Sequence, residues 1–269
     1  MSAARLGGKE SVAATVESRF TRAGMNSGNP TLRPSAFENE RGQSTGAVMT
    51  LDGTLHKTAI LLLILTVTAA FTWTTGRANP GLAGAYAIGG AIAGIILALI
   101  TIFVKKASPI TAPLYATAEG LLLGALSLFM EQKFKGIVTP AIGLTFGLLG
   151  VMLALYRFRI VQATRGFTMA IFGATAAIGL VYLVSFVMRL FGSDIPYIHG
   201  SGPIGIGFSL VVVAIAAFNF ILDFAAIEEG VDSGAPKYME WYCSFALLVT
   251  LVWLYIEILR LLAKLRGRD

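Results

Sequence analysis

Long apolar runs recur along most of this chain, each about as long as a helix that crosses a lipid bilayer. A helix of about 20 apolar residues spans the roughly 30 Å of hydrocarbon in a membrane. The runs lie near 57–75, 81–104, 110–130, 138–156, 168–190, 204–227 and 240–262. They lack the polar–apolar alternation over about ten residues that a membrane β-strand requires. The sequence therefore predicts an all-α membrane protein with seven transmembrane helices in one domain, residues 51–265.

Composition supports a lipid environment and argues against nucleic acid. Hydrophobic residues make up 55% of the 269 residues and charged residues only 13%, whereas a soluble domain carries about 25% charged residues. The net charge of +6 is spread over loops and chain ends, as charges that flank membrane helices are. We expect a multi-pass integral membrane protein, with the lipid bilayer as its first partner and no nucleic acid.

Residues 1–50 differ from the rest of the chain. They are rich in Arg, Ser, Asn and Gly, and Pro30 and Pro34 interrupt any regular element. This composition predicts a disordered polar tail. No apolar stretch lies near the start, so a cleaved secretory signal is not expected, and Met1 and Met25 are both candidate starts.

The basic residues favour an orientation with the N-terminus inside. The inner loops and helix ends would then hold Lys57, Lys105, Lys106, Arg157, Arg159, Arg165 and Lys237. The outer ones would hold Arg77, Lys133, Lys135 and Arg189. This excess predicts N-inside by the positive-inside rule. The basic residues of the C-terminus, Arg260, Lys264, Arg266 and Arg268, would then lie outside; one re-entrant helix would place them inside instead.

Cysteine and histidine are too few for metal or redox chemistry. Cys243 is the only cysteine, so an intrachain disulfide is excluded. His56 and His199 have no partners at metal-ligand spacing, and the glycine-rich stretch around His199 predicts a turn. No catalytic motif is present. Neither an enzyme, a metal site nor a cofactor is expected.

Small residues four apart predict where helices approach closely. In lipid, such pairs let two helix backbones come together. The pairs are Gly90 with Gly94, Gly120 with Gly124, and Gly143 with Gly147.

Three acids lie inside predicted spans: Glu119, Asp223 and Glu257. Ionisable groups at such depth are costly, and by default they mark an ion or proton pathway. The helical rise places Glu119 about 13 Å from the inner end of its helix, Asp223 a few ångströms from the inner face and Glu257 about 24 Å from it. A staggered set of carboxylates would let a cation or proton cross without one large desolvation barrier.

Each acid also has a purely structural interpretation. Glu119 follows Tyr115 by one turn and would form a hydrogen bond inside the bundle in its protonated form. Asn219 lies four residues before the acid of the sixth span, on the same face, and indicates a polar patch. Glu257 precedes Arg260 by three residues, a spacing that suits an ion pair on the helix surface.

A cluster of acids is predicted between the sixth and seventh spans, formed by Glu228, Glu229, Asp232 and Glu240. Such clusters are usually solvated faces. Clustered carboxylates also concentrate cations, so a cation-attracting vestibule is the alternative. Glu240 is expected at nearly the depth of Asp223.

Several segments together resemble the Bax inhibitor-1/YccA family of seven-helix membrane proteins, over about residues 25–265. They are Met49–Leu51, Ala112–Tyr115 with Glu119, Gly120 and Gly124, Ile195–Gly200, Asn219–Asp223, Pro236–Tyr242 and Leu254–Leu259. The resemblance implies a bundle in which six helices surround a central C-terminal helix. It also implies a pH-sensitive calcium leak that a pair of acids on helices six and seven controls. Members are linked to suppression of cell death and, in bacteria, to regulation of a membrane protease. The resemblance, taken as that of a bacterial member, implies a place in the bacterial cytoplasmic (inner) membrane.

Two pairings of the controlling acids stay open. Asp223 matches the helix-six acid of the family, and Glu257 matches the helix-seven acid with Glu where better-known members have Asp. The link between these two positions is longer than is usual in the family. Asp223 with Glu257 is the first pairing, and Asp223 with Glu240 is the second.

The predicted function is a cation leak channel, with calcium as the expected ion, gated by protonation of buried carboxylates. Two acids held close share a proton and titrate as a pair, and charge repulsion after deprotonation would open the path. The alternative is a non-conducting regulator that binds another membrane protein, such as a quality-control protease, through residues 1–50 or the basic C-terminus.

Overall fold

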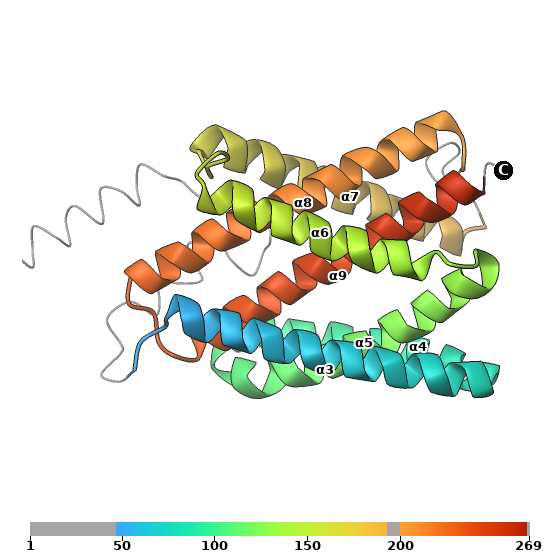
Figure 1. Ribbon diagram of the computed structural model, residues 1–269, viewed down its shortest axis with the longest axis horizontal. Helices are drawn as coiled ribbons and strands as arrows, with labels where there is room; N and C mark the ends of the chain where they lie inside the picture. The colour runs from blue at the N-terminus through green and yellow to red at the C-terminus, as the bar shows by residue number, and fades with distance from the viewer. Residues whose placement is uncertain (1–46, 193–199, 268–269) are drawn as a thin grey trace, which may run out of the picture.

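The computed structural model is a bundle of seven long helices (Figure 1). The structure describes residues 47–192 and 200–267. The helices are α3 (Leu51–Ala78), α4 (Pro80–Phe103), α5 (Ser108–Lys133), α6 (Val138–Arg157), α7 (Arg165–Leu190), α8 (Pro203–Asp232) and α9 (Met239–Arg266). A short 3₁₀ turn, Lys105–Ala107, precedes α5. All seven helices are long and apolar enough to cross a membrane, which confirms the predicted all-α class with seven spans.

The helices alternate in direction, so the two ends of the bundle are chemically different. We name end A the end where α3 and α9 begin, at Leu51 and Met239, and end B the end where α9 finishes, at Arg266. The shortest helix, α6, has 20 residues and is about 30 Å long. A re-entrant helix is therefore absent from the described part of the chain. The first described residues lie at end A and the last described residues lie at end B. The N-inside orientation stays a prediction.

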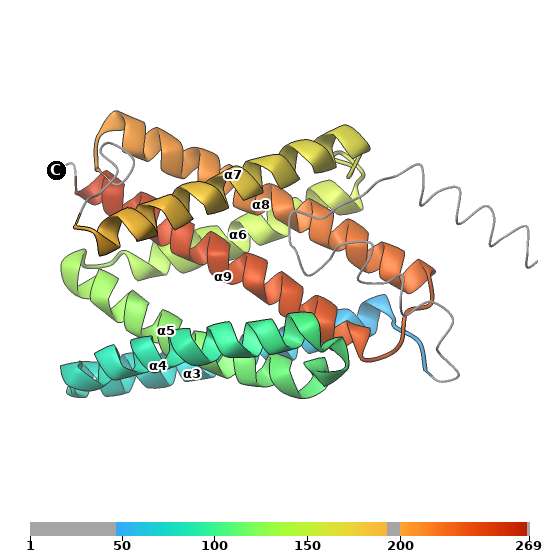
Figure 2. The same ribbon diagram turned by 180° about the vertical axis from the view of Figure 1, so that it is seen from behind.

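Helix α9 is the most buried of the seven spans. In its apolar stretch 72% of the residues are buried and in α8 67%, against 17% in α3, α4 and α7. Its main neighbours are α3, α5, α6 and α8. Figure 2 shows α9 crossing between a group formed by α3, α4 and α5 and a group formed by α6, α7 and α8. A complete ring of six helices around it stays an expectation from the family.

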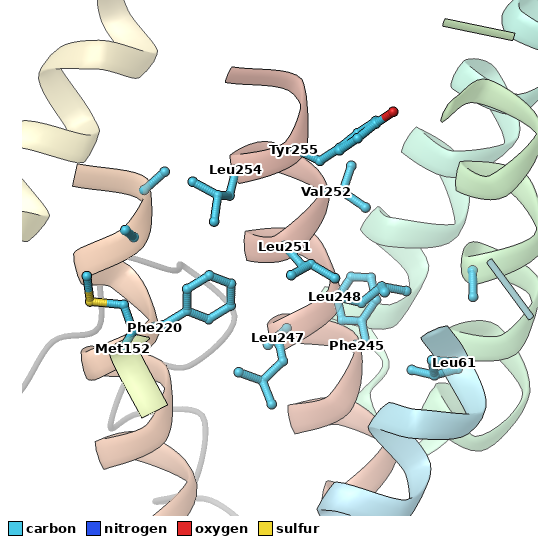
Figure 3. Packing of buried hydrophobic residues seen from close by; sticks show 14 of the residues in the cluster. Leu61, Met152, Phe220, Phe245, Leu247, Leu248, Leu251, Val252, Leu254 and Tyr255 are labelled. Atoms are coloured by element: carbon cyan, nitrogen blue, oxygen red, sulfur yellow. The ribbon is translucent and has the colours of Figure 1, made fainter. Parts of the chain in front are cut away.

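Leucines of α9 form the centre of the apolar core. Leu247 of α9 points toward α8, where Phe220 lies, while Leu248 points toward Leu61 of α3 (Figure 3). Leu251 lines a cavity together with Leu62 and Leu65 of α3. These side chains leave lipid, not water, when the bundle forms. Close van der Waals packing therefore holds the helices together more than the hydrophobic effect does.

Two of the three predicted glycine pairs lie at close helix contacts. A Cβ atom on Gly120 would lie 2.6 Å from the carbonyl oxygen of Leu65 in α3, and one on Gly124 would overlap Ala69 of the same helix. A Cβ atom on Gly90 of α4 would lie 2.6 Å from the carbonyl oxygen of Ala118 in α5. These helices approach closely because the glycines carry no side chain.

The prediction was wrong for the third pair, Gly143 and Gly147 of α6. A Cβ atom at either residue would meet nothing within 4 Å. Both glycines are exposed, because this face of α6 points away from the bundle.

The end of α8 differs from its predicted span and changes the setting of three predicted site residues. The helix continues to Asp232, five residues past the predicted end at Ile227. Glu228, Glu229 and Asp232 therefore lie on the last turns of α8, and the prediction that they form a loop was wrong. The polar tail, apart from its last residues, and the predicted turn at His199 fall outside the described residues.

We predict opposite effects of alanine at Gly124 and Gly143. Gly124→Ala forces α3 away from α5 and should destabilise the protein by about 1–3 kcal/mol, the range for overpacked sites. Gly143→Ala meets open space and should be neutral or stabilising by up to about 1 kcal/mol, since Gly is a poor helix former. Thermal unfolding of the purified protein in detergent measures both, and equal melting temperatures would contradict the assigned α3–α5 contact.

Candidate functional site: buried carboxylates of the helix bundle

Asp223 lies in the middle of the bundle, between α8 and α9. Its side chain is 0% exposed, and the hydroxyl of Thr250 in α9 donates a hydrogen bond of 2.6 Å to Oδ2. Nine residues separate Asp223 from the end of α8 at Asp232, which corresponds to about 13 Å. Helix α8 therefore extends about 13 Å past Asp223 toward end A, and the depth of Asp223 relative to the membrane face stays a prediction.

Asn219 precedes Asp223 by one turn and is buried as well. Its amide nitrogen donates to the hydroxyl of Thr175 in α7 at 2.9 Å and to the carbonyl oxygen of Ile215 at 2.8 Å. Its amide oxygen Oδ1 has no hydrogen-bond partner among the described residues. The two residues thus form a polar patch inside the bundle, with Asn219 bound to α7 and Asp223 bound to α9.

Glu257 lies closer to end B, in a charged cluster of its own. It is 1% exposed and forms an ion pair of 2.7 Å with Arg260. The hydroxyl of Tyr182 in α7 donates to both carboxylate oxygens at 2.9 Å, and the indole nitrogen of Trp253 donates at 3.3 Å. The guanidinium group also lies 4.8 Å from the Tyr182 ring centre. A cation therefore balances the charge of this carboxylate, in the i,i+3 geometry that the sequence suggests.

The structure does not bring Asp223 and Glu257 together. Thr250 marks the level of Asp223 on α9, and Glu257 follows Thr250 by seven residues, or about 10 Å along the helix axis. The family's pair of acids is therefore not in direct contact in this structure.

Glu240 forms the centre of a third cluster, at end A. Its carboxylate is 0% exposed and accepts hydrogen bonds from the backbone nitrogen and the hydroxyl of Thr50, both at 2.9 Å. It also forms ion pairs with Lys57 and, at 2.7 Å, with Lys237. Gly53 packs directly on the carboxylate, where a Cβ atom would overlap it. Glu240 thus joins the first turns of α3 and α9.

A short backbone pairing surrounds this cluster. The nitrogen of Met49 donates to the carbonyl oxygen of Ala235 at 2.7 Å, and the nitrogen of Lys237 donates to that of Ala47 at 3.1 Å. This pairing attaches residues 47–49 to the link between α8 and α9. Ten residues of α9 separate Glu240 from Thr250, about 15 Å, so the expectation that Glu240 shares the depth of Asp223 was wrong.

Glu119 lies at the level of Asp223 but on another interface. Eleven residues separate it from the start of α5 at Ser108, about 16 Å. Its Oε1 lies beside Gly94 of α4, where a Cβ atom would be 3.1 Å away, and its Oε2 has no hydrogen-bond partner among the described residues. The staggered series along α9 therefore consists of Glu240, Asp223 and Glu257, with Glu119 apart from it.

A cleft opens at end A between α3, α6, α8 and α9, with a volume of about 560 Å³. Glu228 and Asp232 line it together with Arg157 and Arg159, so two acids face two cations. The hydroxyl of Tyr156 donates to Glu228. Glu229 is not among the lining residues. A vestibule at this place is thus mixed in charge.

The deep end of this cleft lies close to the acid on α8. Phe224 and Leu247 line it; the first follows Asp223 directly, and the second precedes Thr250 by three residues. Two apolar side chains therefore separate the cleft from the hydrogen-bonded pair of Asp223 and Thr250.

Sequence reasoning missed Lys264 as a buried group. Its side chain is buried, and its ammonium group donates to the carbonyl oxygen of Gly205 at 2.9 Å and to the hydroxyl of Ser209 at 2.8 Å. It ties the end of α9 to the start of α8. Its four-residue spacing from Arg260 was the available signal, since both then lie on one face of α9.

Within residues 47–192 and 200–267, no group of three or more His, Cys, Asp or Glu side chains could hold a metal ion. The site chemistry rests on carboxylates, hydroxyls, one amide and basic side chains.

The fold and these clusters define an integral, multi-pass membrane protein with ionisable groups inside its helix bundle. A family model described as Bax inhibitor 1 like matches residues 29–267, nearly the whole chain. The chain belongs to this family, as the sequence resemblance predicts. A search of curated proteins and a search of solved structures each gave no match.

We predict that Glu240→Gln destabilises the bundle. The amide of the introduced glutamine still accepts hydrogen bonds from Thr50, but the negative charge that attracts Lys57 and Lys237 is removed. Hydrogen bonds to charged groups contribute about 1.5–3 kcal/mol each; because both lysines still reach water, we expect a total loss of about 1–3 kcal/mol. Thermal unfolding in detergent measures the change.

Glu228→Gln is the matched control for this variant. Glu228 is exposed, so its replacement should shift stability by no more than about 0.5 kcal/mol. Equal melting temperatures for the two variants would reject the structural role of Glu240.

Proposed function

We propose that this protein is a pH-sensitive cation leak of its membrane, with calcium as the expected ion and Asp223 as the gating carboxylate. The observation that supports this most is the complete burial of Asp223 in the middle of α8, with Thr250 of α9 as its hydrogen-bond partner. A carboxyl group buried inside a membrane bundle lowers stability. Such a group is therefore interpreted by default as part of an ion or proton pathway.

The gate works through the cost of a buried charge. While Asp223 is protonated, it fits the packed α8–α9 interface. Ionisation makes this burial unfavourable, because a buried carboxylate without water loses its solvation. The ionised group then draws in water and cations from the cleft at end A, past Phe224 and Leu247. The leak therefore increases as pH rises through the titration of Asp223.

This gate needs one carboxyl group and not a pair. Arg260 already balances the charge of Glu257, and Lys57 and Lys237 balance that of Glu240. Glu257, whose charge Arg260 balances, then lies along the cation path between Asp223 and end B. Glu240 holds α3 and α9 together at end A.

We predict that Asp223→Asn abolishes the pH dependence of calcium flux and leaves a low flux at every pH, because the amide mimics the protonated acid. The measurement is calcium entry into liposomes that contain purified protein and a fluorescent indicator, over a pH series. Glu257→Gln should change the size of the flux and keep its pH dependence, and it serves as the matched control.

Three outcomes would contradict parts of this proposal. An unchanged pH profile in Asp223→Asn would reject the gating role. Loss of pH dependence in Glu257→Gln as well would favour the paired acids of the family. Wild-type protein that passes no calcium at any pH would reject the leak and favour a membrane regulator, for which co-purification with a membrane protease is the test.

A further inference from the structure

Two buried polar atoms without hydrogen-bond partners lie on α7 and α8. Among the described residues, three buried side-chain atoms lack such a partner: Glu119 Oε2, Thr168 Oγ1 and Asn219 Oδ1. Thr168 is on the first turns of α7, and Asn219 is in the middle of α8. These two helices pack against each other, and Asn219 binds Thr175 of α7 across this contact.

Helix α7 carries a polar stripe on the face that meets this interface. Thr168, Thr175 and Tyr182 follow each other at intervals of seven residues. Seven residues are close to two helical turns, so the three side chains share one face with a drift of about 20° per step. Thr175 accepts a hydrogen bond from Asn219, and Tyr182 donates to Glu257. The stripe therefore faces α8 and, near end B, α9.

Unpaired polar atoms in such a place call for water. Leaving a buried hydroxyl or amide oxygen unpaired is unfavourable, and internal waters typically make about three hydrogen bonds to such groups. We propose that the α7–α8 interface binds internal water at Thr168 and at Asn219, and that this water connects Asp223 to the aqueous phase at end A. The second half of this inference rests on Asp223 being the gate.

The geometry around Asn219 suits this connection. Residues four apart on a helix have Cβ atoms about 5–6 Å apart, so a water on Asn219 Oδ1 lies within reach of Asp223. Thr168 is the fourth residue of α7, about 5 Å from end A. Ile171 is buried and lies three residues after Thr168 and four before Thr175, on the same face of α7. A water connection along this face has to pass its apolar side chain.

Cys243 and Tyr156 are titratable groups on the helices packed around Asp223. From α9 the buried thiol of Cys243 faces both Asp223 and Glu240. From α6 Tyr156 lies near the neighbouring Phe224, and its hydroxyl donates to Glu228. From α7 the neutral Thr175 faces Asn219. Water at Asn219 therefore supplies a proton-exchange partner that does not depend on a second acid.

The test is hydroxyl-radical labelling by X-ray radiolysis of the full-length protein in lipid nanodiscs, read by mass spectrometry. Bound water generates radicals beside it, so Phe167 and Phe218, the sequence neighbours of Thr168 and Asn219, should be labelled. Their rings lie 5.7 Å apart. Thr168→Val should lower the labelling of Phe167 to background, and Asn219→Leu should do so for Phe218.

Thr145→Val is the matched control. Thr145 is buried like Thr168, but its hydroxyl already donates to the carbonyl oxygen of Ala141 at 2.8 Å. Its replacement should leave both phenylalanine labels unchanged. Background labelling of the wild-type phenylalanines would overturn the proposal. So would a Thr168→Val variant that keeps its label and melts at a higher temperature, because a dry, unpaired hydroxyl behaves in this way.

Calcium flux separates this proposal from the proposed function. Thr168→Val should slow the response of the flux to a pH step imposed at end A and leave the steady-state pH profile unchanged. Labelling requires no conduction, so a protein that is labelled but passes no calcium would reject the leak and retain the water sites. If the calcium flux depends on pH but neither phenylalanine is labelled, the proposed gate is supported and the proposed water route is rejected.

Discussion

The structure depends on one constraint: a polar group inside a bilayer must find its partner inside the protein. The acids of α8 and α9 meet it in different ways. Glu240 is held by two lysines and Glu257 by an arginine. The ion pair with Lys57 joins Glu240 to α3, and the hydroxyl of Tyr182 joins Glu257 to α7. Asp223 accepts its hydrogen bond from the neutral hydroxyl of Thr250. Protonation can therefore change the fit of Asp223 far more than that of the two ion-paired acids.

The sequence predicts the number and type of the spans well, because lipid imposes length and apolarity on each of them. It fails at the end of α8, where the change from apolar to acidic residues after Ile227 suggests a loop. A helix can leave the hydrocarbon and continue, however, and its last turns then carry Glu228 and Asp232 in a polar region. The helix is therefore about 8 Å longer than predicted, since it continues for five residues past Ile227.

Partners of the site residues are predictable only where they are local in sequence. Arg260 lies three residues from Glu257, and this pairing is visible in the chain. Lys57 lies 183 residues from Glu240, and only packing of α3 against α9 brings them together. The glycine pairs show the same limit. Small residues four apart predict a close helix contact, but the sequence does not say which face of the helix is packed. The predicted contact is therefore present at Gly124 and absent at Gly143.

The positions of the clusters show how α9 is held in the bundle. Glu240 ties the start of α9 to α3, and Glu257 with Tyr182 and Arg260 ties the far part of α9 to α7. Charged contacts therefore hold α9 near both ends. Helix α8 packs against α9 as well, with Lys264 bound to Gly205 and Ser209 near end B and Thr250 bound to Asp223 in the middle. Under the proposed gate, the middle contact is the one that changes with protonation, because Asp223 changes its buried charge there while the contacts near the two ends of α9 persist.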